Sequence, residues 1–285
     1  MRPVVALLTD LGLLDHYAGT MKGVILGICP EATLVDISHD VPPHDVLTAS
    51  LELAACYRYF PAGTVFLVVV DPGVGSARRP LAAEAGEYRF VAPDNGVLSA
   101  VFKEALPRRV VELTERRFAR PTVSRTFEGR DRFAPAAGWL AKGTELRALG
   151  RSLTDYLRLE IPDPAVTENE VRGEVLRVDR FGNLITNIDR RSYDRLGRLG
   201  EAALEVRAGD HRVGRLVSTY SEIMPGEVCA LFGSTDHLEV AANSASAAET
   251  LRLTRGAVVT VTRTADDRPT RCALPPFDAS VAGRD

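Results

Sequence analysis

The chain has little of what marks several large classes of protein. It has 285 residues but only four cysteines, Cys29, Cys56, Cys229 and Cys272, and they form no Cys-x-x-Cys pair. This spacing favours buried reduced thiols over disulfides or zinc ligands. No apolar run approaches the roughly 20 residues that a membrane-spanning helix needs. With Met1-Arg2-Pro3 leading straight into a strand pattern, the sequence predicts a cytoplasmic protein with no membrane segment and no signal peptide.

An excess of charge of one sign is also missing. Lys and Arg total 35 against 38 Asp and Glu, for a formal net charge of −3, which gives no electrostatic case for nucleic acid or an anionic membrane. The sequence contains no P-loop, no Gly-x-Gly-x-x-Gly after its first strand pattern and no Gly-x-Ser-x-Gly. Its five histidines show no metal-ligand spacing. We therefore expect no metal and no cofactor. The 45% of hydrophobic residues predicts an ordinary globular protein.

Strand and helix patterns alternate in the first half, which predicts a mainly parallel sheet with flanking helices over residues 1–164. Asp45 is placed to cap a helix that runs to Phe60, and a hairpin is expected around Gly86. The segment Ile161-Pro162-Asp163-Pro164 reads as a linker. The fold class is therefore α/β in its N-terminal part.

Short alternating strands dominate residues 170–264 and predict a β-rich, barrel-like C-terminal domain. The last segment, residues 265–285, is expected to be disordered. The strands are expected at 173–178, 183–188, 204–208, 215–219, 227–232, 237–241 and 257–263, with a helix only at 245–251.

Carboxylates follow two of the predicted strands. The apolar runs Val4–Thr9 and Val65–Val70 end in Asp10 and Asp71, at the edge where open α/β sheets place ligands. The turn after Asp71 is rich in glycine and carries Arg78, which is able to hold that carboxylate in direction. The alternative is structural: aspartates routinely cap helices and stabilise turns.

Two further motifs combine charged and polar groups around a glycine. In Thr126-Phe127-Glu128-Gly129-Arg130-Asp131, Glu128 is a candidate acceptor, whereas the structural alternative makes Asp131 a helix N-cap and Arg130 a surface ion-pair partner. In Asp179-Arg180-Phe181-Gly182-Asn183, the amide matches the edge of adenine and the ring offers a stacking face. The alternative there is a hairpin turn with Gly182 and Asn183 at positive φ. Such groups suit a neutral or cationic nucleoside better than a nucleotide.

Taken together, these and neighbouring motifs resemble the S-adenosylmethionine hydroxide adenosyltransferase family, which is related to the fluorinases and chlorinases. The resemblance runs in order from Val4 to Thr262. The matching segments are Leu8–Gly12, Met21–Gly23, Asp36–His39, Pro42–Asp45, Val70–Gly75, Pro93–Gly96, Thr126–Asp131 and Asp179–Asn183.

The resemblance implies an α/β N-terminal domain and a β-rich C-terminal domain. It also implies a homotrimer, with each site between one subunit's N-terminal domain and its neighbour's C-terminal domain. The implied reaction converts S-adenosyl-L-methionine and water into adenosine and L-methionine. Two alternatives stay open: a halogenase that uses the same substrate, and a non-catalytic module that binds the nucleoside.

Site residues are carried over from the family by motif position. Asp71, Arg78 and Glu128 match the group proposed to position and activate water, although most relatives carry histidine where this chain has Glu128. A second departure is Thr235, where some halogenating relatives have arginine. The substrate-binding positions implied are Asp10 for the ribose hydroxyls, Asp15 and Asp179 for the methionine ammonium, Ser234 for its carboxylate, Asn183 and the backbone around Ser244 for adenine, and Phe181 and Tyr220 for the base or sulfonium.

Overall fold

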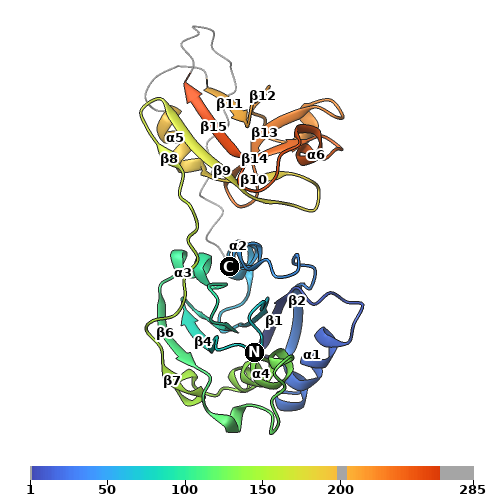
Figure 1. Ribbon diagram of the computed structural model, residues 1–285, viewed down its shortest axis with the longest axis vertical. Helices are drawn as coiled ribbons and strands as arrows, with labels where there is room; N and C mark the ends of the chain where they lie inside the picture. Colours follow the sequence, from blue (N-terminus) through green and yellow to red (C-terminus); the bar gives the residue numbers. More distant parts are fainter. Residues whose placement is uncertain (1, 198–203, 264–285) are drawn as a thin grey trace. The chain divides into compact units, whose positions relative to one another are not determined.

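The computed structural model describes residues 2–197 and 204–263, and the chain divides into two compact units, Met1–Ile161 and Pro162–Asp285 (Figure 1). The expected disordered tail and Cys272 lie outside the described residues. No helix in the described part of the chain has both the length and the apolar character needed to cross a bilayer.

A seven-stranded sheet forms the centre of the first unit, in the order β2-β1-β3-β5-β4-β6-β7. The strands β2, β1, β3 and β5 run parallel, whereas β4, β6 and β7 add antiparallel pairs at one side. The α/β class and the parallel arrangement are thus confirmed. The elements are β1 (Val4–Thr9), α1 (Tyr17–Ile28), β2 (Thr33–Ser38), α2 (Val46–Cys56), η1 (Tyr57–Tyr59), β3 (Val65–Val69), β4 (Pro80–Ala85), β5 (Tyr88–Pro93), α3 (Ser99–Glu104), β6 (Pro107–Glu112), η2 (Arg116–Phe118), η3 (Gly129–Phe133), α4 (Ala134–Ala141), η4 (Leu146–Leu149) and β7 (Arg151–Ser152).

Helices cover both faces of this sheet, which explains its continuous apolar strands. Every residue of β3 is buried. Alternate side chains of β1 enter opposite cores: Leu7 packs with Met21 of α1, and Leu8 packs with Leu53 of α2. Both faces of the sheet are covered by helices. Polar residues follow the strands at the carboxyl end of the sheet, which is where open α/β sheets bind ligands.

The second unit is an antiparallel sheet in the order β12-β11-β15-β9-β10-β14-β13, with β8 paired to β9. Leu216, after β12, forms an isolated bridge with Ala230 of β13, so the two ends of the sheet approach each other and the barrel is nearly closed. The barrel-like prediction is confirmed. The elements are β8 (Ala165–Val166), β9 (Glu170–Val178), β10 (Leu184–Asp189), α5 (Arg190–Gly197), β11 (Leu204–Ala208), β12 (His211–Val213), η5 (Tyr220–Glu222), β13 (Val228–Phe232), β14 (His237–Ala242), α6 (Ala247–Leu251) and β15 (Val258–Arg263).

Two local predictions in this unit are wrong. Residues 215–219 form only an isolated bridge, from Leu216 to Ala230, and no strand. The pairing ends there because the Glu222 side chain accepts hydrogen bonds from the backbone N–H groups of Ser218 and Thr219. The helix α5 is missed by the sequence argument. The helix shows no apolar pattern in the sequence, because Leu196 is its buried residue and the rest of its surface is mostly polar. The helix begins at the Asp189 carboxylate, which accepts a hydrogen bond from the Ser192 N–H at 2.8 Å.

Candidate active site

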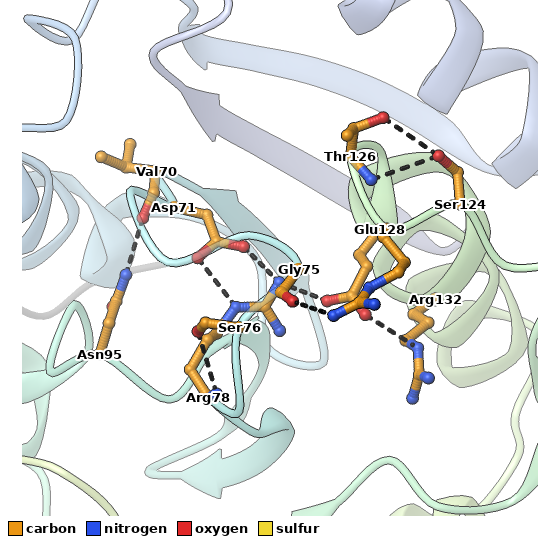
Figure 2. Close-up of polar contacts among 11 residues, drawn as sticks. Val70, Asp71, Gly75, Ser76, Arg78, Asn95, Ser124, Thr126, Glu128 and Arg132 are labelled. Carbon is orange, nitrogen blue, oxygen red and sulfur yellow. Dashed lines mark hydrogen bonds and ion pairs between the residues drawn. The ribbon is translucent and has the colours of Figure 1, made fainter.

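Asp10 and Asp71 follow two strands that are direct neighbours. The strands β1 and β3 pair in parallel, with Thr9 opposite Val69 at their carboxyl ends. Both aspartates therefore lie at the same edge of the sheet, as the strand patterns predict. This edge is where the most buried charged cluster of the first unit is found (Figure 2).

Arg78 binds Asp71 with two donors. Its Nε donates to Asp71 Oδ1 at 2.8 Å, and its Nη2 donates to Asp71 Oδ2. The side chains of Arg78 and Asp71 are only 8% and 6% exposed. A bidentate pair of this kind fixes the plane of the carboxylate as well as its position.

Glu128 completes the cluster from a distant part of the chain. Arg78 Nη2 also donates to Glu128 Oε2, and Arg132 Nε lies 3.2 Å from Glu128 Oε1. Figure 2 shows Arg78 between Asp71 and Glu128, with Arg132 on the far side of Glu128. Charges therefore alternate along the row Asp71, Arg78, Glu128, Arg132. Each of these two carboxylates therefore has a cationic neighbour.

The loop that carries Arg78 depends on glycine. Gly75 has φ 76°, and a Cβ there would lie 2.5 Å from the backbone oxygen of Arg125. Only glycine fits both the conformation and the space. The start of the loop is held by Asn95, whose Nδ2 donates to the Val70 carbonyl at 2.8 Å.

Asp10 is held by a neighbouring loop. Its Oδ2 accepts from the backbone N–H of His44, at 2.8 Å, and His44 has φ 67°. The same loop is tied to the end of β1 by the Gly12 N–H, which donates to the His39 carbonyl at 2.8 Å. The carboxylate thus has a defined direction and keeps one oxygen for a further donor.

Sequence reasoning missed a polar network around the buried side chain of His39. The His39 ring lies between Thr9 and Asp36, with Nδ1 at 2.8 Å from Thr9 Oγ1 and Nε2 at 3.0 Å from Asp36 Oδ1. Lys22 Nζ donates to Asp36 Oδ2 at 2.6 Å. Burial alone would raise the pKa of Asp36, but the hydrogen bonds from Lys22 and His39 outweigh it and lower that pKa. The signal in the sequence was His39 itself, a polar residue directly after a strand.

Asp131 is not a helix N-cap, so that part of the structural alternative is wrong, whereas Arg130 does form an ion pair, with Asp131 itself. It lies inside the π-helical turn η3 and is fully buried. Its carboxylate accepts from the Ser124 N–H at 2.8 Å and from Arg130 Nε at 2.7 Å, and Arg120 Nε lies at 3.4 Å. It anchors the loop before Glu128. Burial would raise the pKa of Asp131, but the bonds from Arg130 and Ser124 prevail and lower it.

Asp15 stands apart from these groups. It lies in the exposed loop before α1 and makes no hydrogen bond or ion pair with the residues that the structure describes. Two exposed leucines, Leu13 and Leu14, precede it. The structure therefore does not bring Asp15 into the Asp71 cluster.

The motif from Asp179 to Asn183 connects β9 and β10 in the second unit. Asp179 Oδ1 accepts from the backbone N–H groups of Phe181 and Asn183, and its Oδ2 accepts from Asn183 Nδ2 at 2.9 Å. Gly182 has φ 85°, whereas Asn183 does not have positive φ, so the hairpin alternative is correct for one of its two residues. Phe181 is 76% exposed and Asn183 is 95% buried. The aspartate thus shapes the loop that presents the ring.

The remaining predicted residues of the second unit lie on loops beside β13 and β14. Tyr220 is in η5, Ser234 is exposed in the turn between these strands, and Ser244 follows β14 with φ 56°. The Tyr220 hydroxyl donates to Glu239 Oε2 at 3.4 Å. Burial, then the charge of Glu239, raises the pKa of Tyr220. Glu239 is a second residue that sequence reasoning missed.

Comparison with known proteins gives consistent relatives over nearly the whole chain. Residues 5–150 match the SAM hydroxide adenosyltransferase N-terminal domain, and residues 173–260 match the C-terminal domain of the same family. An (R)-S-adenosyl-L-methionine hydrolase of Thermus thermophilus is 39% identical, over 90% of this chain and 98% of its own length. The hydrolase of the same name from Salinispora tropica is 37% identical, over 91% of this chain and 98% of its own length.

More distant relatives and solved structures agree with this. A fluorinase of an Actinoplanes species is 29% identical over 92% of this chain and 98% of its own. The crystal structure of an uncharacterized conserved protein from Thermotoga maritima superposes with a TM-score of 0.84 at 37% identity, covering 91% of this chain and all of that one. The protein therefore belongs to the SAM hydroxide adenosyltransferase family.

Proposed function

We propose that this protein is an enzyme that hydrolyses S-adenosyl-L-methionine to adenosine and L-methionine. The observation that carries the proposal is the buried group of Asp71, Arg78 and Glu128 at the strand ends of a chain of this family. Support also comes from relatives named (R)-S-adenosyl-L-methionine hydrolase at 37–39% identity.

The proposed step is an in-line displacement by water at C5′. The water oxygen forms a bond to C5′ while the C5′–sulfur bond breaks. The electron pair of the broken bond goes to sulfur. Because the sulfonium leaves as a neutral thioether, the leaving group needs no acid. Positioning of water and substrate lowers a barrier of this kind by roughly 7–11 kcal/mol.

Asp71 and Arg78 act as orienters of the attacking water. Bulk water is far too weak an acid for a carboxylate to ionise in advance. Proton transfer from the water to Asp71 therefore follows attack. Glu128, which shares Arg78 with Asp71, holds the guanidinium in place.

In the proposed assembly the substrate is held by the first unit of one subunit and the second unit of its neighbour. Asp10 binds the ribose hydroxyls, and its bond from the His44 N–H supports a fixed direction. The other assignments are Asp15 and Asp179 near the methionine ammonium, Ser234 at its carboxylate, Asn183 and Ser244 at adenine, and Phe181 and Tyr220 around the base or sulfonium.

The active form proposed is a homotrimer in the cytoplasm, with sites shared between neighbouring subunits. Membership of the family supports this assembly. The free thiols of Cys29, Cys56 and Cys229 suit a reducing compartment. Size-exclusion chromatography with light scattering tests the trimer, and a monomer at micromolar concentration would contradict it.

The test of the reaction is incubation with S-adenosyl-L-methionine in ¹⁸O-labelled water, followed by mass spectrometry. We expect adenosine that carries the label in its 5′-hydroxyl. Parallel reactions with chloride or fluoride test the halogenase alternative, which is disfavoured because a carboxylate beside the nucleophile site would repel a halide. A halide-dependent 5′-halogenated product would overturn hydrolysis, and tight binding without any product would indicate a non-catalytic module.

A further inference from the structure

Arg132, the last side chain of the alternating row described above, has no role in the function proposed so far. It lies in η3, four residues after Glu128, and its Nε is 3.2 Å from Glu128 Oε1 (Figure 2). The Arg132 side chain is 36% exposed, but the Nε atom itself is buried. Part of the side chain therefore stays in contact with solvent, while Nε is placed at the Glu128 carboxylate.

Local stability does not account for this placement. Among the described residues, Arg132 Nε has no hydrogen-bond acceptor, so its contact with Glu128 is an ion pair without hydrogen-bond geometry. A buried donor without an acceptor lowers the stability of the fold and calls for an explanation. Glu115 lines the same small hollow as Arg132, but no ion pair joins the two in the part of the chain that the structure describes. The carboxylate that Arg132 serves is therefore that of Glu128.

The hollow beside Arg132 has no room for another partner. Its volume is about 10 Å³, and it is lined by Leu113, Phe118, Ala136 and Leu149 besides the two charged residues. A space of this size holds at most a single water. Arg132 thus reaches no ligand through the hollow, and any effect that it has on the reaction passes through Glu128.

The value of a second cation follows from the way in which Arg78 is shared. One atom, Arg78 Nη2, donates both to Asp71 Oδ2 and to Glu128 Oε2, so the two carboxylates compete for it. The formal charges of the row cancel only when Arg132 is counted. Without Arg132, Glu128 would have Arg78 as its only cationic neighbour among the described residues, and it would attract the guanidinium more strongly. The bidentate contact of Arg78 with Asp71 would then be distorted.

We propose that Arg132 is a positioning residue for the water-orienting pair: by binding Oε1 of Glu128, it limits the pull of Glu128 on Arg78 and keeps Arg78 aligned with Asp71. The inference rests on the proposed function and deepens it, because it adds a residue that acts through Glu128. The neighbouring Phe133 ring lies 5.1 Å from the guanidinium carbon of Arg78. The turn η3 therefore supports Arg78 directly through Phe133 and indirectly through Arg132 and Glu128.

The test is a double-mutant cycle on the full chain, with adenosine release from S-adenosyl-L-methionine as the measurement. Arg132→Met removes the cation and keeps an apolar stem for the hollow. We expect kcat to fall about ten- to a hundredfold, the cost of a displacement near 1 Å, with KM nearly unchanged. In the Glu128→Gln background the amide has no formal charge for Arg132 to balance. There, Arg132→Met should cost at least about fivefold less than in the wild type.

Four further variants separate positioning from a merely structural role. Arg132→Lys keeps the cation and should recover most of the lost kcat. Arg132→Gln repeats the cycle with a neutral polar side chain, so a methionine variant that does not fold leaves the test intact. Arg147→Met removes an exposed arginine that pairs with Glu145, and Glu115→Gln removes the other acid beside the hollow. Neither of these two controls should change kcat.

Three outcomes would overturn the inference: wild-type kcat in Arg132→Met, equal kcat in the lysine and methionine variants, or costs that differ by less than about fivefold between the two backgrounds. Failure of the proposed function is a separate result. A wild type that releases no adenosine defeats the hydrolase proposal. A wild type that releases adenosine, combined with any of the three outcomes, defeats only the role of Arg132.

Discussion

Arg78 and Glu128 lie fifty positions apart in the chain, and a hydrogen bond from Nη2 to Oε2 joins them. The same guanidinium binds Asp71 and lies with its carbon 5.1 Å from the centre of the Phe133 ring. Two acidic side chains from different segments thus share one cation. The direction of the proposed water-orienting carboxylate therefore depends on a residue from another part of the fold.

Replacing Asp71 with asparagine should slow the hydrolysis step strongly and leave substrate binding nearly unchanged. The amide keeps the shape but cannot accept the proton that water loses, so we expect kcat to fall about 10²- to 10⁴-fold with little change in KM. Adenosine release, followed by chromatography, measures this. Asp155→Asn, a change at an exposed carboxylate of the same unit, is the control. An Asp71→Asn enzyme with wild-type turnover would refute the role.

Glu128 should act through the position of Arg78. Glu128→Ala leaves the guanidinium with one carboxylate, so Arg78 and Asp71 can shift, and a displacement of about 1 Å costs up to ~100-fold in rate. Glu128→His should recover part of the loss, because an imidazole nitrogen is also able to accept from Arg78. The measurement is kcat for the three proteins. Equal rates for alanine and histidine variants would speak against this explanation.

Gly75 and Gly63 provide a matched pair for the loop. Both have positive φ, 76° and 83°, but a Cβ meets the Arg125 oxygen only at position 75, while position 63 is open. Alanine at either site should cost about 1–2 kcal/mol of unfolding free energy for the left-handed conformation. Gly75→Ala should lose more unfolding free energy than this, and should also lose activity. Urea unfolding measures the stability of both variants, and kcat measures their activity. Similar losses at the two sites would contradict the prediction.

Asp131 should contribute stability that depends on pH. Its pKa is lowered in the folded state from an ordinary value of 3.8, so the folded protein favours the charged form. The contribution is therefore complete above the unfolded pKa and is lost as the pH falls through the lower folded value. Asp131→Asn should cost about 1–3 kcal/mol at pH 7. Urea unfolding should show this difference shrinking below about pH 4; a constant difference would argue against it.

Much of the fold followed from local patterns in the sequence. The apolar runs before Asp10 and Asp71 predicted buried parallel strands, and Asp45 caps α2 as expected, with its carboxylate accepting from the Thr48 N–H at 3.0 Å. Strand order within the sheets could not be read this way, because pairing joins segments far apart in the chain. The helix α5 was missed because its surface is mostly polar.

The residues of the candidate site also differ in how far the sequence predicts them. The pair Asp71 and Arg78 lies within one loop, so spacing alone favoured it. The roles of His39, Asp131 and Glu239 depend on burial, which no single sequence motif reports. Glu239 in particular sits in an ordinary strand pattern, and its burial and the contact of its carboxylate with Gly233 distinguish it from a surface acid.

Glu128 immediately precedes the π-helical turn η3, in which the Ala134 N–H bonds to the Gly129 carbonyl, one residue further back than in a regular helix. That extra residue sets the direction in which Glu128 points around the helix axis, relative to the packed helix α4. Deleting one residue from η3 would turn Glu128 by about 100° around the axis. The position of Glu128 in the proposed water-orienting cluster thus depends on the length of this turn, and length changes in this segment are expected to be far less tolerated than substitutions.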